Sequence, residues 1–413
     1  MRVWFSTLED RSLNSNFIEK IEKIMGILDN WSARRLTLLS KITIIKTLAV
    51  SQIVYILSSL PTPPDILKTI KSILYDFLWD GKIKSKGGHI MINNYAKGGL
   101  KMLDIQSFNE SLKMKWIQGY LNEENKGKWK LFFDHYLGKY GGKLLFRSNL
   151  KQQDSALLNL KDPFLKEIIQ YWTKCNYKDD NLDFASTSIW YNSHIRIENR
   201  PFFYRSWLSA GIKEIRDLLD NDQNSLSYNA IIDKYSIKTN NLEYRKVISA
   251  IAHYKKVHST AYHDPTPKDP VDTLLSHTKV SKKIYECLIN EKASIPSRSQ
   301  EKWLEERDIH CNLSITVNWE NTYCLSSLCT RESKLRAFQF KFLHRKIATN
   351  DFLYKIGTKQ TDSCSFCEEQ KETLVLDLQI HSELLEEHVR VDLSKLRRFR
   401  KRLSLFVSLF RYH

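Results

Sequence analysis

The chain has 413 residues, of which 42% are hydrophobic and 12% aromatic, so it is a folded protein of roughly two to four domains rather than a disordered chain. It carries 64 basic and 47 acidic residues, and the net charge of +17 favours a nucleic acid or another anionic surface as partner. No apolar stretch approaches the roughly 20 residues of a membrane span, and the residues after Met1 do not form a secretory signal, so we expect no membrane partner. Seven cysteines are too sparse for a disulfide framework and fit the cytosol or the nucleus.

The stretch from 31 to 60, WSARRLTLLSKITIIKTLAVSQIVYILSSL, carries the clearest helical pattern. At about 100° per residue its apolar side chains fall in one sector, as on a buried helix face: Leu38, Ile42, Ile45, Ala49, Ile53 and Ile56. Four cations flank that sector: Arg34, Arg35, Lys41 and Lys46. Small hydroxyl side chains lie opposite it, and hydroxyls beside cations suit contact with a phosphate backbone. An ordinary amphipathic helix with a solvated polar face gives the same pattern.

The run W-x-x-R-x-L-T-L-L-x-K-I-T-I-I-K-T-L, followed by Tyr55, Leu60 and Pro61, resembles the thumb region of reverse transcriptases from LINE-type (non-LTR) retrotransposons. In that family the thumb follows the polymerase palm and grips the primer–template duplex. Ser40 stands where the family usually has Gly, and Ser is a tolerable helix residue. The resemblance implies that the cations of this stretch contact a duplex.

Further stretches resemble the same family: GGLKMLDIQSFNESLKMKWI at 98–117, SIWYNSHIRIENRPFFYRSWLSAGI at 188–212, and 331–357. We expect five modules, namely a thumb-like helical region (1–80), a basic loop and helical connector (81–150), a helical region with the IWYN segment (151–310), a zinc-binding-like segment (311–375) and a divergent basic tail (376–413). The periodicity predicts a mainly α fold of multi-helix modules, with one small β hairpin between 89 and 105. The aromatic residues of 188–212 fit a core, although interleaved arginines would also let them stack on bases. Ser107 and Glu110 predict a capping box at a helix start.

Two other segments add candidate nucleic-acid contacts. The loop GKIKSKGG contributes Lys82, Lys84 and Lys86, although a charge run is usually a solvated surface. The basic face of 331–357 contributes Arg336, Lys341 and Arg345. The partner implied by the resemblance is RNA or an RNA–DNA hybrid. His344 has no second histidine or carboxylate at metal-binding spacing, so we interpret it as structural.

Tyr177-Lys-Asp-Asp180 spells YxDD, the motif in which reverse transcriptases hold Mg²⁺ on a hairpin. Such a hairpin needs apolar strands on both sides, whereas TKCNYKDDNLD is polar and typical of a loop. The family's motif also precedes the thumb. We therefore identify no Mg²⁺ site and no catalytic residue in this chain, and expect that it does not polymerise DNA by itself.

Cys364-Ser-Phe-Cys367 spaces two thiolates for one Zn²⁺ ion, which makes half of a tetrahedral site. The context DSCSFCEEQKET resembles the zinc-binding segment at the carboxyl end of these proteins, where a later His and Cys complete the site. Here Leu376 stands in the place of that His and no cysteine follows, so we expect an incomplete zinc site. His381 and His388 are the nearest substitutes. The Arg-rich tail beyond 376 departs from the family pattern.

Three hypotheses follow for the function. The chain is a nucleic-acid-binding fragment of a non-LTR reverse transcriptase that lacks the palm and the endonuclease. Alternatively, it is a non-functional product of a decayed element, or a polymerase part that needs a palm supplied in trans. The first two hypotheses differ in whether the chain prefers a primer–template duplex to any other polyanion, such as heparin. The third requires that an added palm restore nucleotide incorporation.

Overall fold

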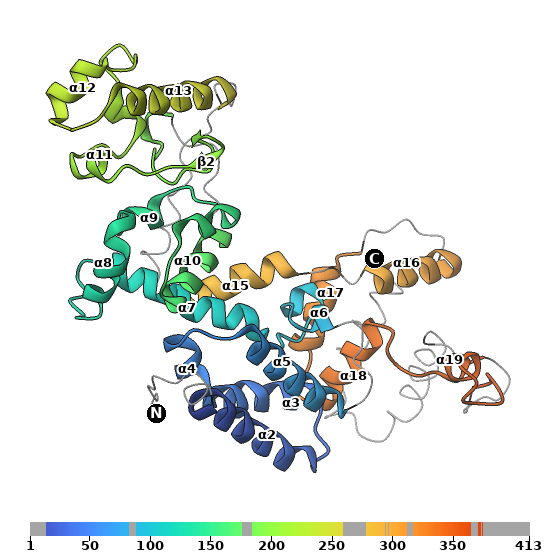
Figure 1. Ribbon diagram of the computed structural model, residues 1–413. Helices are drawn as coiled ribbons and strands as arrows, with labels where there is room; N and C mark the ends of the chain where they lie inside the picture. The colour runs from blue at the N-terminus through green and yellow to red at the C-terminus, as the bar shows by residue number, and fades with distance from the viewer. Residues whose placement is uncertain are drawn as a thin grey trace. The chain divides into compact units, whose positions relative to one another are not determined.

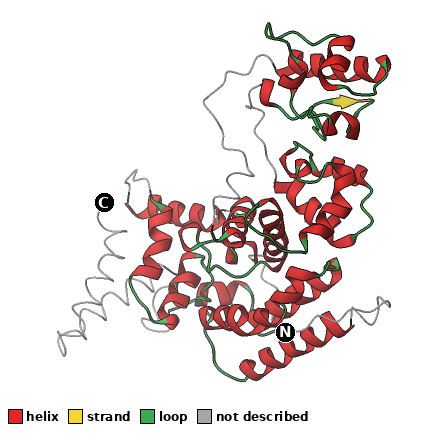
Figure 2. Ribbon diagram, turned by 90° about the vertical axis from the view of Figure 1, so that its left-hand side faces the viewer, coloured by secondary structure: helices red, strands yellow, loops and turns green. Residues whose placement is uncertain are grey.

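The computed structural model describes residues 14–81, 88–175, 184–258, 278–293, 295, 297–311, 317–364, 371, 372 and 374 (Figure 1). In these residues helices dominate and one short antiparallel strand pair occurs, as Figure 2 shows in red and yellow. The predicted mainly α fold with a small hairpin is confirmed. None of the described helices is long and apolar enough to cross a membrane.

In the first part of the chain the elements are η1 (Asn14–Ile18, a π-helical turn), α2 (Glu19–Ser32), α3 (Leu38–Ile44), η2 (Ile45–Ala49, π-helical), η3 (Val50–Gln52, 3₁₀), α4 (Val54–Ser59), α5 (Pro64–Trp79), α6 (Gly88–Met91), η4 (Tyr95–Lys97, 3₁₀), α7 (Ile105–Leu121), α8 (Lys130–Leu137), η5 (Gly138–Tyr140, 3₁₀), α9 (Leu144–Arg147), η6 (Gln152–Leu158, 3₁₀) and α10 (Pro163–Cys175). They are followed by η7 (Phe184–Ser186, 3₁₀), β1 (Arg196–Ile197), β2 (Arg200–Pro201), α11 (Arg205–Ser209), η8 (Ile215–Leu218, 3₁₀), α12 (Tyr228–Tyr235), α13 (Asn241–His258), α15 (Val280–Lys292), α16 (Ser297–Cys311), α17 (Trp319–Leu328), α18 (Ser333–Leu343) and α19 (Asn350–Lys355).

The chain divides into two compact units, each made of segments far apart in sequence. The first unit comprises 1–20, 53–70 and 105–288, and the second comprises 21–52, 71–104 and 289–413. These boundaries follow tertiary contacts rather than the linear modules expected from the sequence, which remain a prediction.

The first unit has a large core of aliphatic and aromatic side chains. In it α7 packs against α4 and α10, and the two largest fully buried side chains are Trp190 and Trp207. The Trp190 indole N–H donates to the carbonyl of Ile212 (2.8 Å). The core interpretation of the IWYN segment is therefore confirmed, because its tryptophans fill the interior and are not available to stack on bases.

A buried polar network in the same unit joins the proline-rich turn after α4 to α7 and α10. The Lys113 ammonium is fully buried and lies 2.7 Å from Oε2 of Glu167 and 3.1 Å from Oγ1 of Thr62. Oε2 also accepts the Thr62 backbone N–H (3.0 Å), while Oε1 accepts the hydroxyl of Tyr171 (2.6 Å) and the amide of Asn109 (3.1 Å). Burial lowers the pKa of Lys113 and the nearby carboxylate opposes that effect. The carboxylate thus satisfies four donors at once.

The second unit contains the thumb-like stretch up to residue 52. The apolar sector predicted from the sequence is buried here, with Ile42, Ile45 and Ala49 inside. The stretch is not one regular helix, however. Thr37 caps α3 by accepting the N–H of Ser40 (3.2 Å), and the helix widens into the π-helical η2 and tightens into η3.

The strand pair does not lie where the sequence suggested a hairpin. It pairs Arg196 with Pro201 and Ile197 with Arg200. Between 88 and 105 the chain instead forms α6, the η4 turn and a loop in which the Met91 carbonyl accepts the N–H groups of both Leu100 (3.2 Å) and Met102 (2.8 Å). The predicted position of the hairpin was therefore wrong. In an antiparallel pair of strands, successive backbone N–H groups bond to different carbonyls, whereas here the Met91 carbonyl accepts both, so no strand ladder continues from it.

Candidate nucleic-acid interface

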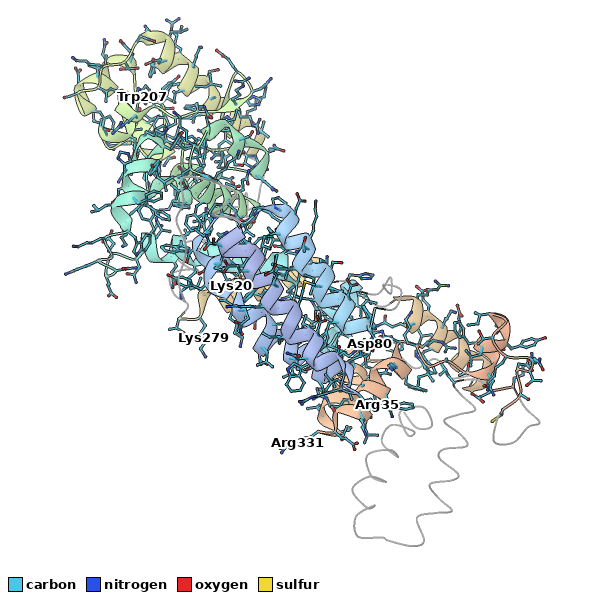
Figure 3. The ribbon with its side chains drawn as sticks, turned by 60° about the horizontal axis from the view of Figure 1, so that its bottom comes forward. Lys20, Arg35, Asp80, Trp207, Lys279 and Arg331 are labelled. Carbon is cyan, nitrogen blue, oxygen red and sulfur yellow. The ribbon has the colours of Figure 1, made fainter. Side chains whose placement is uncertain are left out.

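The connection between α2 and α3 carries two of the predicted contact residues. Arg34 and Arg35 are both exposed, and the Arg34 guanidinium lies over the ring of Trp31 at 4.3 Å from its centroid. Figure 3 marks Arg35 in this connection and Arg331 just before α18. Their side chains are accessible to an anionic ligand.

Lys41 differs from its neighbours. It is only 3% exposed, and its ammonium is paired with the Asp80 carboxylate and 3.4 Å from the carbonyl of Leu78. The pairing uses a residue at the end of α5, which the local helical pattern cannot reveal. Because the Lys41 side chain is buried and its charge is already paired with Asp80, we leave Lys41 out of the interface that we propose.

Helix α18 packs against α3 and so brings the two basic stretches predicted from the sequence into one unit. Arg336 of α18 also reaches Tyr95 in η4. The Arg336 guanidinium lies 5.2 Å from the Tyr95 ring centroid, and the Lys101 ammonium lies 4.9 Å from it. Lys46, on η2, is close enough for its charge to interact with that of Lys101. We call Lys46, Tyr95, Lys101 and Arg336 the Tyr95 cluster.

The Tyr95 cluster concentrates positive charge, and the described part of the chain places no carboxylate against it. Burial and the charge of Lys101 together lower the pKa of Lys46. Among the residues that the structure describes, none of its three cations is within ion-pair distance of an acidic side chain. Lys101 and Lys46 are nevertheless surface-exposed. Crowded cations that remain accessible are favourable for an anion, because the anion relieves their mutual repulsion.

The loop that carries Tyr95 and Lys101 is held by its backbone. The Asn94 side chain accepts the N–H of Lys97 (2.8 Å), which starts the turn, and Gly98 ends it at φ +73°. Gly99 is so close to the Asn93 carbonyl that a Cβ would lie 2.1 Å from its oxygen. These constraints fix the direction in which Lys101 leaves the loop.

His344 fastens this loop to the end of α18. Its Nε2–H donates to the Gly98 carbonyl (2.7 Å), and its ring stacks on Tyr323 with centroids 5.6 Å apart. Burial lowers the pKa of His344 to about 4, with Lys346 contributing, so the imidazole is neutral near pH 7. The structural interpretation of His344 is confirmed.

The outer face of α18 adds exposed cations around an aromatic ring. Lys334 and Lys341 are exposed one turn before and one turn after the exposed ring of Phe338. Lys341 was predicted from the sequence, whereas Lys334 and Phe338 were missed. Arg345 lies beyond the helix end at φ +53°, and its guanidinium covers Trp303 at 4.7 Å, so it does not continue this face.

Several predicted site residues, together with two segments to which no site was assigned, lie outside the described residues. These are Lys82, Lys84 and Lys86, the YKDD motif, the tail and Cys367. Cys364 is described and buried. Among the described residues no three metal-binding side chains gather, and zinc binding at Cys364 and Cys367 remains a prediction.

No protein-family profile matches the chain. A stretch of 127 residues is 28% identical to the "Transposon TX1 uncharacterized 149 kDa protein" of Xenopus laevis. The match covers 30% of this chain and 10% of the length of that protein. The similarity supports an origin in a transposable element.

Proposed function

We propose that the chain is a nucleic-acid-binding part of a non-LTR retrotransposon reverse transcriptase, and that it grips the phosphate backbone of RNA or of an RNA–DNA hybrid. The observation that carries the proposal is the Tyr95 cluster, in which Lys101 and Arg336 from separate segments lie against one ring and the charge of Lys101 acts on Lys46, with no carboxylate partner among the described residues. The similarity to a transposon protein and the net charge of +17 agree with it. The proposal assigns binding, not catalysis, and implies work in the cytosol or the nucleus.

The chemistry of the cluster suits phosphate better than bases. Arg336 offers a planar fork of donors that matches two phosphate oxygens, whereas Lys46 and Lys101 supply compact point charges. Tyr95 is already covered by two of these cations, so its ring orients them and is not a platform for a base. Exposed Arg34, Arg35, Lys334 and Lys341 extend the basic surface within the same unit. Contacts of this kind bind without reading sequence.

The test is fluorescence anisotropy of the full chain with a labelled RNA–DNA hybrid at several salt concentrations. Removing two cations in Lys101→Gln/Arg336→Gln should weaken binding roughly tenfold at low salt, since an exposed ion pair contributes up to about 1 kcal/mol. The slope of log affinity against log salt should flatten by about two, at ~0.9 per lost phosphate contact. Lys302→Gln is the matched control, because Lys302 is exposed on α16 of the same unit between Glu301 and Glu305.

Two results would contradict the proposal. If the double variant binds the hybrid as the parent chain does, the Tyr95 cluster does not contact the phosphates. If equal charge concentrations of heparin displace the hybrid completely from the parent chain, the basic surface is an unspecific relic of a decayed element.

A further inference from the structure

Helix α8, in the first unit, has an apolar side that the core does not use. Phe133 and Leu137 point into the core and are buried. On the opposite side Leu131, Phe132 and Tyr136 are 70%, 40% and 37% exposed. Single exposed apolar residues need no explanation, but three of them on a helix of eight residues form a patch.

The patch is mainly aromatic. The rings of Phe132 and Tyr136, one helical turn apart, have centroids 4.6 Å apart and are tilted by 48°. The exposed imidazole of His135 meets the edge of Tyr136 with centroids 5.1 Å apart. The Phe132 ring also makes an edge contact with the ring of the buried Phe133, with centroids 6.2 Å apart. The two outer rings are therefore held in place while their surfaces stay open to solvent.

Positive charge borders this patch at both ends. Exposed Lys128 precedes the helix, and exposed Lys139 follows it in η5, where its ammonium lies 4.7 Å from the ring centroid of Tyr140. Asp134, the acidic residue of α8, projects to a different side and accepts the hydroxyl of Tyr120 (2.8 Å). The solvent-facing side is thus aromatic and basic, and the helix residues on it include no carboxylate.

From this juxtaposition we propose that the outer face of α8 binds single-stranded nucleic acid, with bases stacked on Phe132 and Tyr136 and phosphates on Lys128 and Lys139. The inference rests on the proposed function and narrows it, because stacking needs unpaired bases that a duplex does not offer. The eight residues of α8 rise by about 12 Å at ~1.5 Å each, the length of about four stacked nucleotides at ~3.4 Å each.

Charge argues against a second copy of this chain as the occupant. Two copies that met through α8 would bring their lysines and histidines together. A polyanion neutralises the same groups, and its bases cover the apolar rings.

The experiment compares Phe132→Ala/Tyr136→Ala with the parent chain on labelled single-stranded oligouridylate and on the RNA–DNA hybrid. Because the alanine variant loses both stacking rings, binding of oligouridylate should fall at least about tenfold, whereas binding of the hybrid should change less than about twofold. Leu242→Ala is the matched control, because Leu242 is 64% exposed on α13 of the same unit. Phe132→Tyr/Tyr136→Phe keeps both rings and should retain the parent affinity, which would assign the loss in the alanine variant to the removal of the rings.

Three outcomes would overturn the inference. Oligouridylate could bind the alanine variant as it binds the parent while the hybrid still depends on Lys101 and Arg336, and then only the α8 site would be refuted. Equal losses on both ligands would remove the preference for single strands. A parent dimer that becomes monomeric in the alanine variant, with oligouridylate affinity unchanged, would identify α8 as a contact between copies.

Discussion

Glu167→Ala gives a sharp test of the physical reasoning, because it removes one partner of a buried ion pair. The Lys113 side chain has no exposed surface, and the Glu167 side chain is only 11% exposed. Without the carboxylate, the Lys113 ammonium keeps the Thr62 hydroxyl and the Asn109 amide oxygen as neutral partners only. An uncompensated buried charge of this kind costs about 3–5 kcal/mol. The Thr62 N–H loses its acceptor as well.

The assay is urea unfolding of the full chain followed by tryptophan fluorescence, because Trp172 and Trp190 belong to the same core. With a slope of about 2–3 kcal/mol per molar urea, the midpoint of that core's transition should fall by roughly 1.5 M. Glu123→Ala is the control. Its partner Lys143 is 3.5 Å away and both side chains are exposed, so that loss should stay below about 1 kcal/mol.

A second variant separates charge from packing. Lys113→Met/Glu167→Leu replaces the pair by apolar groups of similar size and should recover the part of the loss that comes from the unpaired ammonium, whereas the Thr62 N–H, the Asn109 amide and the Tyr171 hydroxyl still lack the carboxylate. The reasoning is refuted if Glu167→Ala shifts the midpoint no more than Glu123→Ala does. It is also refuted if the double variant is as unstable as the single one.

Two further predictions concern the loop that carries the Tyr95 cluster. The pKa of His344, about 4 in the folded chain, lies below its unfolded value of about 6.5. The unfolded chain therefore binds more protons between these values, and the stabilising contribution is complete above pH 6.5 and is lost as the pH falls to 4, by up to about 3 kcal/mol. Urea midpoints at pH 7.5 and 4.5 should differ more for the parent than for His344→Gln, and equal differences would count against the assignment. Gly99→Ala should destabilise by about 1–3 kcal/mol and weaken hybrid binding, because the new Cβ meets the Asn93 carbonyl. Gly26→Ala, with nothing within 4 Å of the new Cβ, should instead be neutral or stabilising, and urea midpoints of the two variants check both effects.

Features that depend on local periodicity could be predicted from the sequence. The apolar sector of the thumb-like stretch is buried, and Trp190 and Trp207 fill the core as their setting indicated. In both cases the sequence groups apolar side chains, at helical spacing or in an aromatic cluster. Burying such a group in the interior is favourable, because it removes apolar surface from water.

Features that depend on partners far apart in the chain could not be predicted from the sequence. Lys41 has the same local pattern as Lys46, but Asp80 removes it from the surface. The predicted capping box is wrong for the same reason, since α7 begins before Ser107 and the Glu110 carboxylate accepts instead from Lys174 (3.1 Å) of α10. Lys101 was overlooked because its importance arises only when Arg336 of α18 reaches the same Tyr95 ring. Tertiary contacts, which no helical pattern encodes, decided each case.

The most direct measurement of the central claim is hydrogen–deuterium exchange of the full chain with and without the RNA–DNA hybrid. If the Tyr95 cluster holds the phosphate backbone, amides of 94–102 and of 333–343 should exchange more slowly in the complex, and the protection should disappear in Lys101→Gln/Arg336→Gln. Protection confined to other segments, with both of these exchanging as in the free chain, would contradict the claim.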